Sequence, residues 1–255
     1  MPFLVVIVNY GKPRVPRSDL TIRAGLSAIV LKMLISGSLD LDETLRRLSV
    51  QRPVFHSEAD LQLALAWEMK RCDPMMRVRL ETCPAAAIHL DIACTRVDLG
   101  RYSAIELKYL TRSWMGKVEG EEYNLKNHRA QDIRGYDVVK DIARIEVLVN
   151  DRANADGAVI VLTNDSYYWN PPQKIPDITN ASEFRIHEGA VLSGCRSWGP
   201  RTGDGTKRGR ERPIVLLGTY QMHWGEYSTV EGYRASEFRL LSVSIKGGLK
   251  AGRQG

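Results

Sequence analysis

Residues 89–110 read HLDIACTRVDLGRYSAIELKYL, and this stretch decides the expected fold because two strand-like segments in it carry three charges. The segment DLGR, at 98–101, has the composition of a turn, and apolar residues recur at every second position on both sides of it. We therefore expect a β-hairpin. Asp91, Glu106 and Lys108 fall inside its strands, where a charge must be paired, solvated or bound to an ion, because burying it alone is costly.

The turn also predicts which side chains share a face of the hairpin. If Asp98 pairs with Arg101, then Asp91 lies opposite Lys108, and Glu106 is one diagonal step away. All three charges then share one face, because side chains alternate with a period of two. The other face is predicted to be apolar, formed by Leu90, Ile92, Cys94, Ile105, Leu107 and Tyr109.

Two carboxylates beside a lysine are suited to phosphodiester hydrolysis. A hard cation such as Mg²⁺ takes oxygen ligands, so Asp91 and Glu106 are candidate ligands for one. Lys108 would then orient a water or stabilise charge on a phosphoryl oxygen. The alternative is a solvated cross-strand ion pair between Asp91 and Lys108, and the D…ExK pattern by itself leaves both interpretations open.

The flanking sequence predicts an α/β domain built around one sheet. In FHSEADLQLALAWEMKR, Ser57 followed by Asp60 is typical of a helix start, and Glu58 shares a helix face with Leu61 and Leu65. Residues 77–82, 157–165, 214–224 and 238–246 are predicted strands, and 137–149 a helix. Glu58 is therefore expected to point toward the sheet, although an acid in a first helical turn also interacts favourably with the helix dipole.

This order of residues resembles a known family. An acid early on a helix, then Asp91 in the second strand and Glu106-x-Lys108 in the third, is similar to the PD-(D/E)XK nuclease superfamily, which has a restriction-endonuclease-like fold. The segments FHSEADLQLALAW, VRLE, HLDIA and AIELKYL look like those of its uncharacterised prokaryotic branch, over roughly residues 52–165. Leu90 stands where the superfamily name expects proline, which ligates nothing.

The resemblance implies a core with a central mixed β-sheet flanked by helices, and a Mg²⁺-dependent nuclease, with Mn²⁺ as the alternative metal. It implies Asp91, Glu106 and the carbonyl of Leu107 as metal ligands, Lys108 as the catalytic lysine and Glu58 as a supporting acid. The implied substrate is nucleic acid, with DNA preferred. Cutting of both strands of a duplex would favour a homodimer.

Two other polar residues are candidate members of the site. Glu81 lies on the polar face of the first predicted strand, near the expected metal. Some branches of the superfamily carry a Gln and a Tyr four residues apart on the following helix. Here Gln131 and Tyr136 are five apart, about 140° round a helix, so Gln131 is equally interpreted as a surface amide.

A basic loop is predicted at residues 195–213, CRSWGPRTGDGTKRGRERP. Flexible basic side chains position a nucleic-acid backbone without reading its sequence, and the alternative is a solvated surface loop. The whole chain has a net charge of +6 and a sequence pI of about 9.2, which suits a polyanionic partner. The candidate phosphate-binding residues are Arg201, Lys207, Arg208, Arg210 and Arg212.

The remaining sequence features bear on domains and location. We expect a partly helical N-terminal extension at 1–50 and the nuclease-like domain at 51–255. The four cysteines lack the spacing of a zinc site, and no segment has the length and composition of a membrane span, so we expect a cytoplasmic protein without membrane contact. The competing hypothesis for function is a nuclease-like module that binds nucleic acid or protein without cutting.

Overall fold

The expected hairpin is present in the computed structural model, which describes residues 33–85, 88–172, 180–232 and 234–248. Strand β4 (Ile88–Arg96) and strand β5 (Arg101–Leu110) are joined by the four residues 97–100. The turn is longer than predicted: Arg96, not Asp98, pairs with Arg101. Arg96 instead binds the Asp98 carboxylate from the end of the strand. The predicted register is therefore wrong by two residues, a shift that preserves which side chains alternate together.

The hairpin lies within a mixed six-stranded sheet of order β11-β12-β8-β5-β4-β3. Its other strands are β3 (Arg77–Ala85), β8 (Ala155–Thr163), β11 (Trp224–Thr229) and β12 (Glu237–Lys246). β5 and β8 are parallel and the remaining pairs are antiparallel. The α/β class with a central mixed sheet is thus confirmed.

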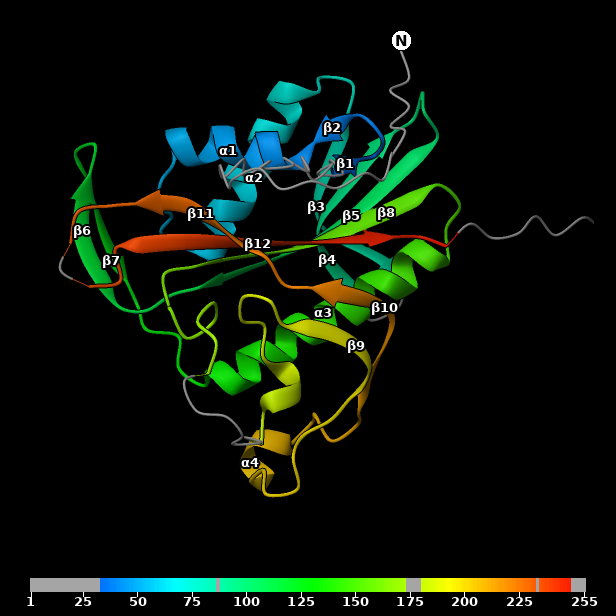
Figure 1. The fold of residues 1–255 in the computed structure, drawn as a ribbon. Coiled ribbons are helices and arrows are strands. Elements are labelled where there is room, and N and C mark those ends of the chain that lie inside the picture. Colours follow the sequence, from blue (N-terminus) through cyan, green and yellow to red (C-terminus); the bar gives the residue numbers. More distant parts are fainter. Residues whose placement is uncertain (1–32, 86–87, 173–179, 233, 249–255) are drawn as a thin grey trace, which may run out of the picture. The chain divides into compact units, whose positions relative to one another are not determined.

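Helices cover both faces of this sheet (Figure 1). α1 (Leu41–Gln51) and α2 (Glu58–Cys72) lie on one face, and α3 (Gln131–Asn150) lies on the other together with β9 (Val191–Arg196) and β10 (Ile214–Gln221). The side chain of Ser57 caps α2 by accepting from the Asp60 N–H, as predicted. Because α3 lies between the parallel strands β5 and β8 in the chain, these three elements form a β-α-β unit, and β5 belongs both to this unit and to the β4–β5 hairpin.

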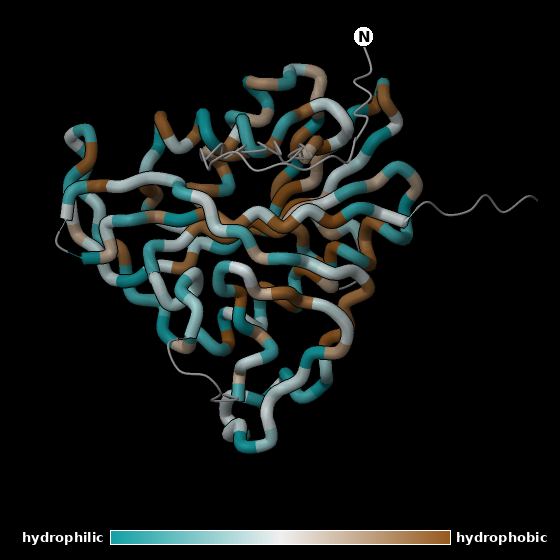
Figure 2. The backbone as a smooth tube through the Cα atoms, viewed as in Figure 1, coloured by the Kyte–Doolittle hydropathy of each residue, from teal (hydrophilic) through white to brown (hydrophobic). Residues whose placement is uncertain are grey.

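Two hydrophobic cores result, one on each side of the sheet. Ile92, Ile105 and Leu107 pack with α1 and α2, as the alternation predicted. Leu90 was predicted to join them but packs in the core on the α3 side, with Ala93 and Ala104. The polar face of the hairpin is therefore covered by α3. Figure 2 shows the hydrophobic segments gathered in the central strands and the hydrophilic ones mostly at the periphery.

Several short elements complete the described chain. They are β1 (Leu34–Ile35), β2 (Leu39–Asp40), β6 (Trp114–Val118), β7 (Glu121–Leu125), the 3₁₀ helix η1 (Ser182–Phe184) and α4 (Asp204–Lys207). The hairpin β6–β7 was not predicted. Residues 34–40 form the β1–β2 hairpin within the extension at 1–50 that was expected to be partly helical.

The compact unit that contains the sheet begins at Lys32, earlier than the expected boundary at residue 51. Leu41, Leu45 and Leu48 of α1 are buried in the same core as α2, so α1 belongs to this unit. Residues 1–32 lie outside the described part of the chain. Among the helices that are described, none is long and apolar enough to cross a bilayer.

Candidate active site at the divergence of β4 and β5

Strands β4 and β5 separate where the charged residues of the hairpin begin. Their pairing runs from Arg96 and Arg101 to Ile92 and Ile105 and then stops, whereas β5 continues to pair with β8 as far as Leu110. On the other side of β4, the partner strand β3 has an irregular register after Thr82. Such bulges bend a strand, and β4 is no longer paired with β5 over this irregular segment.

Carboxylates occupy the backbone positions that β4 leaves open. The N–H of Leu107 donates to Asp91 Oδ2 at 2.6 Å, and the N–H of Tyr109 donates to Glu58 Oε2 at 2.7 Å. Two buried strand donors are thereby satisfied, since an unpaired buried N–H is costly. The same bonds fix Asp91 and Glu58 along one edge of β5, so both sequence-predicted acids lie where the strands part.

Glu106 and Lys108 project from β5 toward α3 and meet two charged residues of that helix. Glu106 Oε2 lies 2.6 Å from Nη2 of Arg144, and Lys108 Nζ lies 3.0 Å from Oδ2 of Asp141. Arg144 also contacts Asp141 Oδ1 at 2.9 Å, which joins the pairs into one network. Lys108 Nζ in addition donates to the carbonyl of Leu107 at 2.8 Å.

Glu106 is the most deeply buried acid of this network, with 1% of its surface exposed. Its Oε1 is buried and has no hydrogen-bond partner among the described residues. Burial, together with repulsion from Asp91 and Asp141, raises the pKa of Glu106 to about 9, despite the contact with Arg144. At neutral pH the carboxyl group therefore holds a proton.

The neighbouring groups show the same competition between burial and charge. Burial raises the pKa of Asp141 and of Glu58, and the nearby Lys108 opposes the shift in both. Burial lowers the pKa of Lys108, but the carboxylates of Asp141 and Glu58 outweigh it and raise the pKa above its ordinary value. Lys108 is consequently an ammonium group at neutral pH.

The network has more acids than bases. Four carboxyl groups, those of Glu58, Asp91, Glu106 and Asp141, interact with two cations, Lys108 and Arg144. If all were ionised, the site would hold two more negative than positive charges. That excess adds to the effect of burial on the pKa of Glu106, and it is the charge that one divalent cation would neutralise.

The ion pairs nonetheless hold some of these oxygens in place. In the described ranges, no cluster of three or more His, Cys, Asp or Glu side chains has the arrangement of a metal site. Arg144 occupies one oxygen of Glu106, and Lys108 occupies the carbonyl of Leu107, the third ligand that the family resemblance implies. A bound cation would therefore compete with these two basic side chains for ligand oxygens, and Oε1 of Glu106 is the oxygen of that carboxyl group that neither contacts.

A pocket of about 550 Å³ opens beside Glu58 and Lys108. Its wall is formed by the ends of β5 and β7 and by Lys126 and His128, which follow β7 and lie beside Thr111. Lys126 and Arg134 are exposed and line the same pocket. The site thus combines a carboxylate cluster with a solvent-accessible basic wall, which would attract a phosphate group.

The other candidate residues lie at different distances from this cluster. Glu81, exposed on β3, accepts from the side-chain amide of Gln62, and that same amide donates to the carbonyl of Asp91. Gln131, at the first turn of α3, donates to Asp165. It precedes Asp141 by ten helical residues, about 15 Å along the axis, and so lies outside the cluster.

The predicted basic loop lies apart from the cluster. α4 and its flanking residues are well separated from β4 and β5 in Figure 1. The loop is held by Trp198, which stacks on Tyr136 of α3 and donates from its indole to the carbonyl of Arg210. The structure does not bring Arg201, Lys207, Arg208, Arg210 and Arg212 to the charged network, because none forms an ion pair with it in the part of the chain described.

Sequence reasoning missed Asp141, Arg144 and Gln62. Asp141 and Arg144 interrupt the apolar stripe of α3 between Val138, Ile142 and Ile145, and that interruption is a signal that was present in the sequence. Gln62 lies one position after the inward-facing Leu61, and nothing in its local pattern marks it. Comparison of the chain with protein-family models, with curated proteins and with solved structures finds no match.

Proposed function

We propose that the chain is a divalent-cation-dependent nuclease with a restriction-endonuclease-like core, related to the PD-(D/E)XK superfamily. The observation that carries the proposal is the convergence of Glu58, Asp91, Glu106 and Lys108 where β4 and β5 separate. These are four residues that the family resemblance selected from the sequence. Their convergence supports the resemblance because they come from one helix and two strands.

The residues present fit a hard cation in their chemistry. The donors are carboxylate and carbonyl oxygens, which Mg²⁺ and Mn²⁺ prefer. The buried Oε1 of Glu106 lacks a partner among the described residues, and the site has an excess of negative charge. A cation would be held by Asp91, Glu106 and the carbonyl of Leu107, and when bound it would supply Lewis-acid stabilisation of the phosphate and a more acidic water.

The protein's own groups would position and stabilise the reacting phosphodiester. Lys108 remains charged at neutral pH, so it would stabilise negative charge developing on a phosphoryl oxygen rather than remove a proton. Glu58, fixed by the Tyr109 N–H, would hold a water by hydrogen bonding at the mouth of the pocket. Lys126 and Arg134 would bind the adjoining phosphates.

The substrate class follows from the basic wall and the charge of the chain. A polyanion gains from each exposed cation along its path, and nucleic acid is the polyanion whose hydrolysis the site would catalyse. DNA is the substrate we propose first, in keeping with the superfamily resemblance.

One observation favours the competing function, a module that binds nucleic acid without cutting. Arg144 and Lys108 already contact Glu106 and Asp141, as they would in a site that has no need of a metal cation. Under that alternative the basic pocket would still bind a nucleic-acid backbone. Metal dependence of cleavage distinguishes the two functions.

The test is a cleavage assay on single-stranded DNA, plasmid DNA and RNA, with Mg²⁺, with Mn²⁺ and with chelator. We expect cleavage that requires the metal and is lost in Asp91→Ala and Lys108→Ala. Lys117→Ala, an exposed lysine on β6, is the matched control and should cleave like the wild type. Salt-sensitive binding without cleavage on any substrate would instead establish the non-cutting module. On plasmid DNA, a linear first product would indicate that two copies act together.

A further inference from the structure

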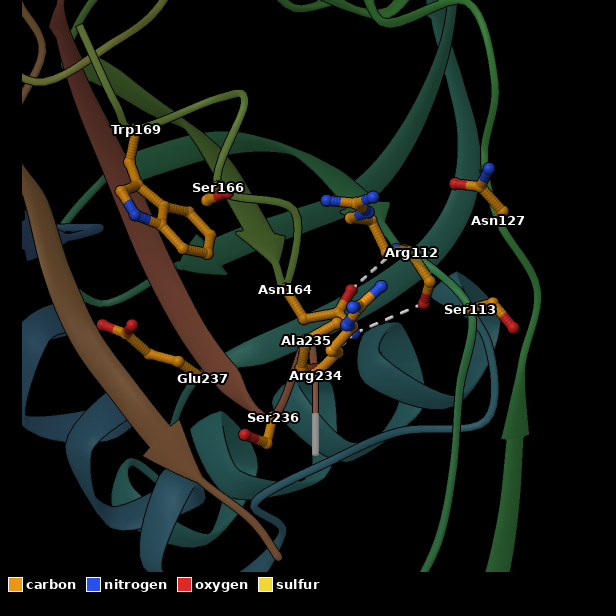
Figure 3. Close-up of a pocket in the computed structure, with 10 residues that line it drawn as sticks. All are labelled: Arg112, Ser113, Asn127, Asn164, Ser166, Trp169, Arg234, Ala235, Ser236 and Glu237. Atoms are coloured by element: carbon orange, nitrogen blue, oxygen red, sulfur yellow. Dashed lines mark hydrogen bonds between the residues drawn. The ribbon is translucent and has the colours of Figure 1, made fainter. Parts of the chain in front are cut away.

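A second pocket, of about 630 Å³, lies beyond the end of β5 (Figure 3). Figure 3 shows Trp169 on one side of it and Arg112 and Asn127 on the other. Neutral hydrogen-bonding side chains, among them Ser113 and Ser166, line the space between them. The pocket therefore combines an aromatic wall, a cation at the rim and several donors and acceptors, and the proposed mechanism uses none of these groups.

The pocket is held open by a buried amide. Asn164, 2% exposed, accepts from the N–H of Arg112 at 2.8 Å and donates to the carbonyls of Arg112 and Ala235. It thus ties together the chain segments that follow β5, follow β8 and precede β12. Trp169 is fixed as well, since Arg239 lies over its ring at 5.4 Å and its carbonyl accepts from Glu188. A site built this way loses little entropy when a ligand binds.

The pocket shares a wall with the candidate active site. Thr111, Lys126 and His128 line the pocket beside Lys108, whereas Arg112 and Asn127 line the second pocket. Hydrogen bonds from the Thr111 hydroxyl to the Lys126 carbonyl, and from the His128 N–H to the Thr111 carbonyl, make this wall a single unit. Lys108 and Arg112 are four residues apart, so the two pockets are separated by no more than about 13 Å along the chain at the rise of a strand.

We propose that this second pocket binds one unpaired nucleobase of the strand that is cut, which makes single-stranded nucleic acid, or a duplex with an unpaired base, the preferred substrate. The inference rests on the proposed function. Nucleobases are flat, and their edges need hydrogen-bond partners, which the side chains of Ser113, Ser166 and Asn127 supply beside the apolar edge of Trp169. Arg112, exposed at the rim, binds the phosphate of the same nucleotide. The distance of about 13 Å along the chain between Lys108 and Arg112 corresponds to about four nucleotides at the 3.4 Å rise of stacked DNA.

The test measures binding without cleavage, by fluorescence polarisation in chelator. The probes are a labelled oligothymidylate and an abasic oligonucleotide of equal length and charge. The wild type should bind the thymidylate at least about fivefold more tightly than the abasic strand, the lower limit for one bound base. Ser113→Phe, which places a ring in the pocket from an exposed position, should reduce the affinity for thymidylate to that for the abasic strand.

A second variant keeps the test decisive if Ser113→Phe lowers the melting temperature. Arg112→Ala changes only an exposed side chain and should weaken binding of both probes, more than Arg77→Ala does at the start of β3. If Ser113→Phe leaves the ratio of the two affinities unchanged and metal-dependent cleavage is intact, the proposed base pocket is refuted. The proposed nuclease activity is not affected by that result. Displacement of the thymidylate by equimolar thymidine monophosphate would show that the pocket binds a free nucleotide, and it would also refute the proposal that the pocket binds a base of the cut strand. A wild type that neither binds nor cleaves would overturn both proposals.

Discussion

The substitution Glu106→Gln tests the electrostatics of the site independently of catalysis. In the unfolded chain Glu106 titrates near 4.5, and in the folded protein burial and the neighbouring acids raise its pKa to about 9. Between these values the folded state holds one more proton than the unfolded state. The free energy of unfolding must therefore fall as the pH rises through this window.

The size of the effect follows from the same values. One proton difference changes the free energy of unfolding by about 1.4 kcal/mol per pH unit, which limits the loss to about 4 kcal/mol between about pH 5.5 and about pH 8.5. We expect about half of this, about 2 kcal/mol, because relaxation of the folded protein and entry of water reduce the cost of ionising a buried carboxyl group. Gln cannot ionise, so Glu106→Gln should match the wild type within about 1 kcal/mol at the lower pH and exceed it by about 2 kcal/mol at the higher.

The assay is urea denaturation in chelator at several pH values. The difference between wild type and Glu106→Gln isolates Glu106 from other titrating groups, and Glu122→Gln, an exposed residue on β7, serves as the control. A difference that stays constant with pH, or that shows the variant less stable at high pH, would refute the account of a protonated Glu106.

Three further variants have distinct expected outcomes. Lys108→Met should reduce cleavage by about 100-fold or more while binding of Mn²⁺ persists, measured by initial rates and calorimetry. Arg144→Met should lower the free energy of unfolding by about 3 kcal/mol in urea denaturation near neutral pH, because it removes the cation that contacts Glu106 and leaves Asp141 with Lys108 alone; an unchanged stability would show that the Arg144 contacts contribute nothing. Ser57→Ala should cost about 1 kcal/mol through loss of the α2 cap, visible as a lower melting temperature.

The sequence was sufficient for four strands of the central sheet and for α2. Alternation predicted β3, β4 and β5, a continuous apolar run predicted β8, and the Ser57 cap predicted the start of α2, because these signals depend on neighbours in the chain. The hairpin register failed because Arg96 binds Asp98 at a four-residue turn, where DLGR had suggested a tighter one. A shift of two residues leaves the alternation intact, so the error did not affect the choice of site residues.

The site was predicted only in part for a related reason. Asp91, Glu106 and Lys108 share a hairpin, so local geometry groups them, and the helical stripe brings in Glu58. Asp141 and Arg144 reach the site only because α3 packs across β5, a long-range contact that periodicity does not encode. Leu90 joined the opposite core because β4 bends away from β5 at this point, which no pattern in the strand itself reveals.

The most direct test of the account is a calorimetric titration of Mn²⁺ into the wild type and into Glu106→Gln. The measurement is made in two buffers of different ionisation enthalpy, so that proton release is detected. We predict saturable binding by the wild type with release of protons near neutral pH, because the cation displaces the proton of Glu106, and loss of that binding in the variant. Absence of binding by the wild type, or equal binding by Glu106→Gln, would contradict the claim that this carboxylate cluster holds a catalytic cation.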